Sequence, residues 1–126
     1  MDEKRRERLE KRLQTMRERA LKAIRQVEED EDPRAGAAGR EETRFHIHMG
    51  DLGSDAEERE REFMIAALES DLVARIDEAL ELLISDPDRY EICDRCGRRI
   101  DFERLELVPW TRLCAPCAAA EEAGEA

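Results

Sequence analysis

The sequence contains few aromatic residues and no long apolar segment. Aromatics make up 4% of the 126 residues, whereas charged residues make up 44%. Such a chain has too little apolar material for a thick core, although a helix pair can still bury a narrow apolar stripe. No run approaches the ~18 apolar residues of a membrane-spanning helix, and residues 1–10 lack the apolar core of a signal peptide. We therefore expect a soluble, cytoplasmic protein that does not enter a membrane.

Basic charge is scarce in the middle of the chain. The net charge of −11 divides into +3 for residues 1–29, −11 for residues 30–90 and −3 for residues 91–126. An acidic segment of this kind repels nucleic-acid phosphate, so we expect no direct DNA binding. The same charge would suit a basic protein surface or a metal ion.

Two segments have the periodicity of amphipathic helices. Between Lys4 and Glu29, apolar residues recur in steps of three and four and predict one seam, made of Leu9, Leu13, Met16, Ala20, Ile24 and Val27. From Asp55 to Ser85 a second seam is predicted, made of Ile65, Leu68, Leu72, Ile76, Leu80 and Leu83, with Phe63, Val73 and Ala79 flanking it. Two helices of similar length, each with one apolar stripe, bury those stripes by packing antiparallel.

Boundary signals bracket the second helix. Ser54 and Glu57 have the Ser-x-x-Glu spacing of a capping box, and Pro87 ends the apolar run. Residues 30–53 contain Pro33 and four glycines, and they predict a loop that is long for a helical hairpin. We therefore predict an antiparallel coiled-coil hairpin over residues 1–89 with a tip loop at about 30–53. A module that contains all four cysteines, and a C-terminal tail, follow over residues 90–126.

All four cysteines lie near the C-terminus, in two Cys-x₂-Cys pairs. Cys93 and Cys96 are separated by 17 residues from Cys114 and Cys117. Each pair places two thiolates on one tight turn, and the spacing is typical of a tetrahedral four-cysteine zinc site. Gly97 after the first pair permits a turn that other residues resist. A disulfide or redox pair is the alternative, but a reducing cytosol and the lack of a βαβ pattern favour one structural zinc ion.

Three further side chains could have either a structural or a functional role. His46 and His48 could be metal ligands, but they are distant in sequence from four thiolates that already fill a site, so we interpret them as loop residues. Trp110 is the only tryptophan, and it either covers the core of the zinc module or forms a binding hot spot.

Residues 93–117 resemble the zinc finger of the DksA/TraR family of bacterial RNA polymerase regulators. The matching residues are Tyr90, Cys93, Cys96, Gly97, Ile100, Arg104, Leu105, Pro109, Leu113, Cys114 and Cys117, with Phe63 near the start of the second helix. The resemblance implies an antiparallel coiled coil beside a zinc finger. It also implies binding to RNA polymerase without binding to DNA, insertion of the coiled coil into the secondary channel, and acidic tip residues that act near the catalytic site.

The tip departs from the family pattern Asp-x-x-Asp-x-Ala. The nearest match reads Asp51-Leu52-Gly53-Ser54-Asp55-Ala56, so the two acids are four residues apart. We predict that Asp51 and Asp55 form the regulatory tip. The alternative for Asp55 is a purely electrostatic role at the start of the helix. We also expect little dependence on guanosine tetraphosphate, because Arg75 is the only basic residue between Glu62 and Asp88.

The prediction is a mainly α protein with a long antiparallel coiled-coil hairpin, a small four-cysteine zinc finger and a short C-terminal helix. Its expected function is transcription regulation through RNA polymerase binding, as a binding protein and not an enzyme. A zinc-ribbon DNA-binding factor, a coiled-coil and zinc adaptor for another protein, and a redox enzyme that uses the cysteine pairs are the alternatives.

Overall fold

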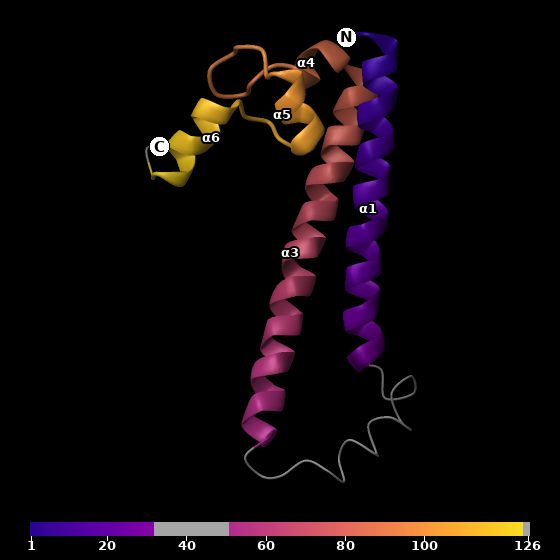
Figure 1. Ribbon diagram of the computed structural model, residues 1–126, viewed down its shortest axis with the longest axis vertical. Helices are drawn as coiled ribbons and strands as arrows, with labels where there is room; N and C mark the ends of the chain where they lie inside the picture. Colours follow the sequence, from indigo (N-terminus) through magenta and orange to yellow (C-terminus); the bar gives the residue numbers. More distant parts are fainter. Residues whose placement is uncertain (32–50, 125–126) are drawn as a thin grey trace. The chain divides into compact units, whose positions relative to one another are not determined.

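Five helices account for most of the described chain. The computed structural model describes residues 1–31 and 51–124 (Figure 1). The helices are α1 (Glu3–Glu31), α3 (Asp51–Ser85), α4 (Pro87–Tyr90), α5 (Phe102–Leu107) and α6 (Ala115–Glu122). Over these residues there is no β-strand, only an isolated antiparallel bridge between Ile92 and Arg99. The fold is therefore mainly α, as predicted.

The chain divides into two compact units. One contains residues 1–18 and 73–126, and the other contains residues 19–72. The predicted division into a hairpin at 1–89 and a finger at 90–126 follows sequence order, and it stays a prediction. Within residues 1–31 and 51–124, no helix is both long enough and apolar enough to cross a membrane.

In the first unit, α1 and α3 run antiparallel. Arg17 pairs with Asp77 across the two helices at 2.6 Å, and the terminal amine of Met1 lies 3.5 Å from the carboxylate of Asp88. Later residues of α1 therefore lie beside earlier residues of α3, so the two helices run in opposite directions, which can be followed in Figure 1. The fully buried apolar side chains of these two helix segments are Leu9, Leu13, Ile76, Ala79 and Leu83. All five belong to the predicted seams or their flanks.

In the second unit, the predicted seam of α3 is wrong at two positions. Ile65 is 49% exposed and Leu68 is 68% exposed, although both were expected in the interface. The half-buried positions of this stretch are Glu62, Ala66, Glu69 and Leu72. Glu69 and Glu62 continue a seven-residue repeat from Ile76 toward the start of the helix, and Leu68 lies off that line. The large apolar residues Phe63, Met64, Ile65 and Leu68 thus do not mark the face that is covered.

Only the N-terminal end of α3 differs from the prediction. The helix begins at Asp51, so Ser54 lies inside it and is not its N-cap. At the other end α3 stops at Ser85, before Pro87, as predicted. Asp86 then caps α4, because its carboxylate accepts the backbone N–H of Arg89 at 3.3 Å. The tip loop expected at about 30–53 lies largely outside the described residues, as do His46 and His48.

Candidate metal centre

The four cysteines converge on one point. Their Sγ atoms all lie within 4.8 Å of one another, and those of Cys96 and Cys114 are 3.7 Å apart. A tetrahedral zinc ion with Zn–S bonds of about 2.3 Å places its sulfurs roughly 3.8 Å apart. A disulfide would need about 2.05 Å, and the four thiols are free. The cluster therefore has the dimensions of a four-thiolate zinc site.

The first cysteine pair lies on a tight turn. The backbone N–H of Gly97 donates to the carbonyl of Cys93 at 3.0 Å, and the N–H of Cys93 donates to the carbonyl of Arg98 at 2.8 Å. Gly97 has φ = +74°, a conformation that side chains with a Cβ disfavour. The turn therefore needs the glycine, as the sequence predicted.

The second pair lies at the start of α6. Cys114 is the N-cap residue of this helix, and Cys117 lies in its first turn, with Pro116 between them. Proline suits the first turn because its missing N–H has no partner there in any case. The positive end of the helix dipole also favours a thiolate at this position. Local chain geometry thus aims both pairs at the same point.

The pKa values of two of the thiols are shifted in opposite directions. Burial alone would raise the pKa of Cys93, but backbone N–H groups of Cys96, Cys114 and Arg95 donate to its sulfur and lower the pKa to about 6. The pKa of Cys117 is raised to about 12, chiefly by hydrogen bonding to Cys114 and by burial. Four thiolates so close together repel one another unless a cation neutralises them. The donor set therefore suits a soft divalent cation such as Zn²⁺, and leaves no open position for catalysis.

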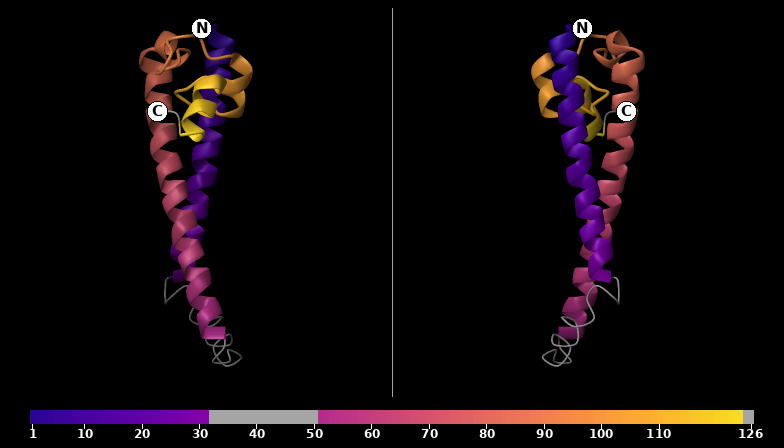
Figure 2. Two further views of the ribbon diagram at one scale, coloured as in Figure 1. Left: turned by 90° about the vertical axis from the view of Figure 1, so that its left-hand side faces the viewer. Right: turned by 90° about the vertical axis from the view of Figure 1, so that its right-hand side faces the viewer.

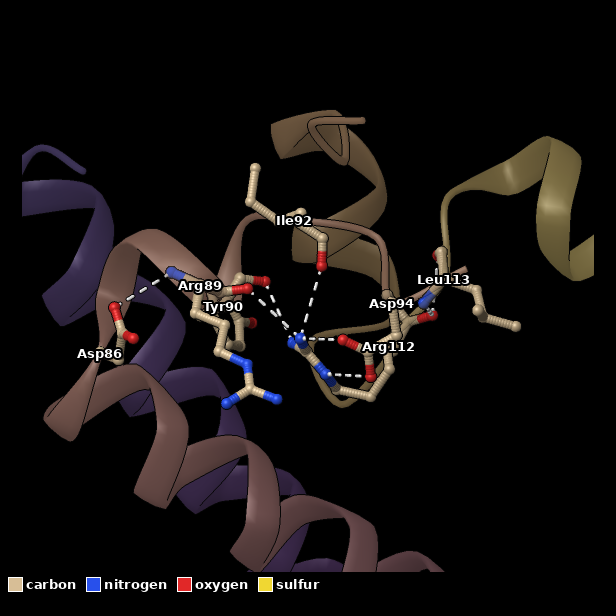
Figure 3. A network of polar contacts seen from close by, with 8 residues as sticks. Asp86, Arg89, Tyr90, Ile92, Asp94, Arg112 and Leu113 are labelled. Atoms are coloured by element: carbon tan, nitrogen blue, oxygen red, sulfur yellow. Dashed lines mark hydrogen bonds and ion pairs between the residues drawn. The ribbon is translucent and has the colours of Figure 1, made fainter. Parts of the chain in front are cut away.

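Arg112 fastens the first cysteine turn to the end of α4. Its guanidinium donates to the carbonyls of Tyr90, Arg89 and Ile92 at 3.2–3.4 Å. It also donates to the carboxylate of Asp94, between the first two cysteines, at 2.9 Å (Figure 3). The sequence did not single out Arg112, because backbone carbonyl acceptors have no side-chain signature. The Arg112 cluster is a second, metal-independent support for the finger.

A buried hydrogen bond adds to this support. The hydroxyl of Tyr90, which is completely buried, donates to the carbonyl of Pro109 at 2.7 Å. Burial raises the pKa of this phenol above its ordinary value. Arg104 donates to the carbonyl of Leu113 at 2.8 Å and so ties α5 to the segment before the second cysteine pair.

Helix α5 rests on the N-terminal part of α1 (Figure 2). The guanidinium of Arg5 lies 4.6 Å from the centre of the Phe102 ring. Arg8 pairs with the carboxylate of Glu106 at 3.7 Å, and Arg12 donates to the carbonyl of the same residue. The finger is therefore connected to α1 as well as to the end of α4.

A cavity of about 460 Å³ lies beside the finger. Its lining combines Arg75, Glu78 and Arg104 with Trp110 and Arg112, among others. Trp110 is half-buried and borders this cavity, so it is neither a fully buried core residue nor a fully exposed one.

The predicted tip residues lie at the start of α3. Asp51 is the first residue of the helix, and Asp55 is half-buried in its second turn. They are far along the sequence from the cysteines.

Comparisons with known proteins give a family match for the finger and two similar proteins. Residues 88–123 match the prokaryotic dksA/traR C4-type zinc finger. The chain is 33% identical over 110 residues to an uncharacterized protein of Aquifex aeolicus, covering 87% of this chain and 73% of that protein. It is 28% identical over 72 residues to general stress protein 16O of Bacillus subtilis, covering 57% of this chain and 43% of that protein.

A solved structure supports the same assignment. The transcription factor DksA2 from Pseudomonas aeruginosa matches with a TM-score of 0.71 and 26% identity, over 99% of this chain and 88% of that one. The match extends over the helices as well as the finger, and the four clustered thiols fit the C4 zinc site. With its one structural zinc ion, the chain belongs to the DksA/TraR family of transcription regulators.

Proposed function

We propose that this protein regulates transcription by binding RNA polymerase and inserting the start of α3 into the secondary channel to modulate initiation. The observation that carries the proposal is the similarity to DksA2 over 99% of the chain, which includes the long helices and not the finger alone. A closed four-thiolate site offers no position for a substrate. The proposal is therefore a regulator that acts by binding in the cytoplasm, not an enzyme.

The proposed regulatory tip consists of Asp51 and Asp55. Because α3 begins at Asp51, both positions fall in its first two turns, and residues four apart lie on the same side of a helix. The spacing of four departs from the family pattern, but both acids remain within the first two turns of the helix. A cationic surface or the metal ion of a polymerase active site is the kind of target that would attract them.

The proposed ligands of the zinc ion are Cys93, Cys96, Cys114 and Cys117. In this proposal the metal holds the finger together and does not react. The finger is attached to α4 through Arg112 and to α1 through Arg5 and Arg8. Its part in the function would be to give polymerase a second contact surface beside the helical one.

Guanosine tetraphosphate has a small part in this proposal. Arg75 remains the only basic residue between Glu62 and Asp88, and several cations must converge to hold a tetraphosphate. We expect the protein to alter transcription without this nucleotide bound at the contact between the protein and RNA polymerase.

Capture by purified core RNA polymerase tests the proposal. The zinc-loaded protein, with an affinity tag, should retain polymerase at physiological salt, whereas a duplex DNA of mixed sequence should not bind. Tight DNA binding without polymerase retention would favour a zinc-ribbon DNA-binding factor. Retention of neither would favour an adaptor for a different protein.

A further inference from the structure

A cavity of about 410 Å³ opens beside the thiol cluster. Cysteines and arginines make up most of its lining, namely Cys96, Cys114, Cys117, Arg98, Arg99 and Arg104. Cys96 is exposed, whereas Cys93, which does not line the cavity, is buried. The cavity therefore lies on the side of the metal centre that faces solvent, and three arginines border the metal centre there.

A fourth arginine connects the two cysteine pairs. Arg95 lies between the first two cysteines in the sequence, and its guanidinium donates to the main-chain carbonyl of Cys117 at 3.3 Å. This contact joins the turn of the first pair to the helix that contains the last cysteine. We call Arg95, Arg98, Arg99 and Arg104 the arginine group.

The arginine group runs against the local composition. Residues 91–126 contain eight acidic and five basic residues, and four of the five basic residues belong to the group. Asp101 is the one acidic residue in the described lining of the cavity, and Glu91 lies 3.4 Å from Arg99 without lining the cavity. An acidic segment thus places most of its positive charge around its thiols.

The chemistry of thiol ligands gives this charge a role. A cysteine binds a metal ion as a thiolate, so metal binding releases the thiol protons to solvent. Four thiolates and one Zn²⁺ leave two net negative charges, so the loaded site is more negative than the free thiols. Positive groups beside the site therefore favour the loaded state, although the ion that enters is itself a cation.

We propose that the arginine group supplies the counter-charge of the zinc centre and so strengthens zinc binding. Arg98 and Arg99 act through charge alone, because their side chains are exposed. Arg95 and Arg104 combine charge with hydrogen bonds to the main chain at Cys117 and Leu113. Zinc retention then depends on residues outside the ligand set, and it does not depend on polymerase binding.

Arg98 and Arg99 offer the cleanest test, because changing their exposed side chains leaves the main-chain contacts of Arg95 and Arg104 in place. Competition between the full chain and a chromophoric chelator measures the affinity for zinc. Arg98→Gln with Arg99→Gln should bind zinc about 2- to 20-fold more weakly, since an exposed charge contributes a factor of about 1.5 to 5. Arg98→Lys with Arg99→Lys keeps both charges and should retain the affinity of the wild type.

A control variant and a change of salt separate charge from structure. Arg19→Gln with Arg25→Gln removes the same charge from exposed positions of α1 that do not line the cavity, and it should leave the zinc affinity unchanged. The difference in affinity between the wild type and the Arg98 and Arg99 glutamine variant should narrow at high salt, because salt screens exposed charges. A loss caused by altered structure would not depend on ionic strength in this way.

Three results would overturn the proposal. The first is wild-type zinc affinity at low salt in the Arg98 and Arg99 glutamine variant. The second is an equal loss of affinity in the lysine variant, because guanidinium geometry and not charge would then be responsible. The third is an equal loss in the Arg19 and Arg25 variant, because the net charge of the whole chain would then explain the effect. Circular dichroism with zinc in excess checks that every variant keeps its helix content.

Discussion

Tyr90 connects the end of α4 to the finger through a single buried hydrogen bond. Tyr90→Phe keeps the ring but leaves the buried carbonyl of Pro109 without its donor at 2.7 Å. Loss of a buried partner costs about 1–3 kcal/mol, so the free energy of unfolding in urea should fall by that amount. A change below the error of the measurement would mean that water replaces the phenol.

The same residue predicts a pH dependence. Burial raises the pKa of the folded Tyr90 phenol, whereas the unfolded phenol titrates near about 10. The stabilisation by neutral Tyr90 is therefore fully present below pH ~10 and declines above it, as the unfolded chain loses its proton first. The stability difference between wild type and Tyr90→Phe should be constant from neutral pH to about 9 and shrink at higher pH. Urea unfolding at several pH values, with zinc in excess, measures it.

Arg112 concentrates several contacts in one side chain. Arg112→Ala should remove its hydrogen bonds to three carbonyls and its ion pair with Asp94, and lower the free energy of unfolding by about 1–3 kcal/mol. Arg98→Ala is the matched control, because Arg98 is an exposed arginine of the same finger. Equal losses of unfolding free energy in the two variants would show that the hydrogen bonds from Arg112 to the three carbonyls do not stabilise the finger.

At the level of the element, the zinc finger should depend on its metal while the long helices should not. Cys96→Ser removes one of four thiolates, so the variant should retain well under one equivalent of zinc and lose order around residues 90–117. Far-ultraviolet circular dichroism should still show most of the helix, because α1 and α3 have buried apolar seams of their own. Elemental analysis, with Ala115→Ser as a control in the same segment, checks the first point. Full zinc content in Cys96→Ser would remove this cysteine from the ligand set.

The elements differ in how far sequence alone could predict them. The α1 seam was predictable because its apolar residues stand among charged ones, and Leu9, Leu13 and Ala20 are buried as expected. Residues 63–68 of α3 are apolar at six consecutive positions, so their periodicity cannot tell which side is covered. The cysteines were predictable because their ligand spacing is fixed by metal geometry.

Helix starts and backbone contacts were harder to predict. The Ser54 pattern matches a capping box, but the same letters occur inside a helix that begins at Asp51. Arg112 donates its hydrogen bonds to main-chain carbonyl groups, which every residue has, so no sequence pattern predicts these contacts. Both failures concern interactions of the main chain, which side-chain patterns record only indirectly.

For the whole molecule, the distribution of charge predicts that binding to polymerase and regulation of polymerase can be separated. Asp51→Asn with Asp55→Asn removes two charges from the first two turns of α3 and leaves the finger and its contacts intact. If the tip acts inside polymerase, this variant should still be retained by core enzyme but lose most of its effect on initiation in a purified transcription assay.

Glu57→Gln with Glu58→Gln is the matched control, since it removes the same charge from exposed positions one turn further along the same helix. Equal loss of activity in both variants would indicate that total acidity matters and not the tip, because long-range attraction to a cationic channel depends on net charge more than on position. Full activity in the Asp51 and Asp55 variant would leave these residues only a role at the start of the helix.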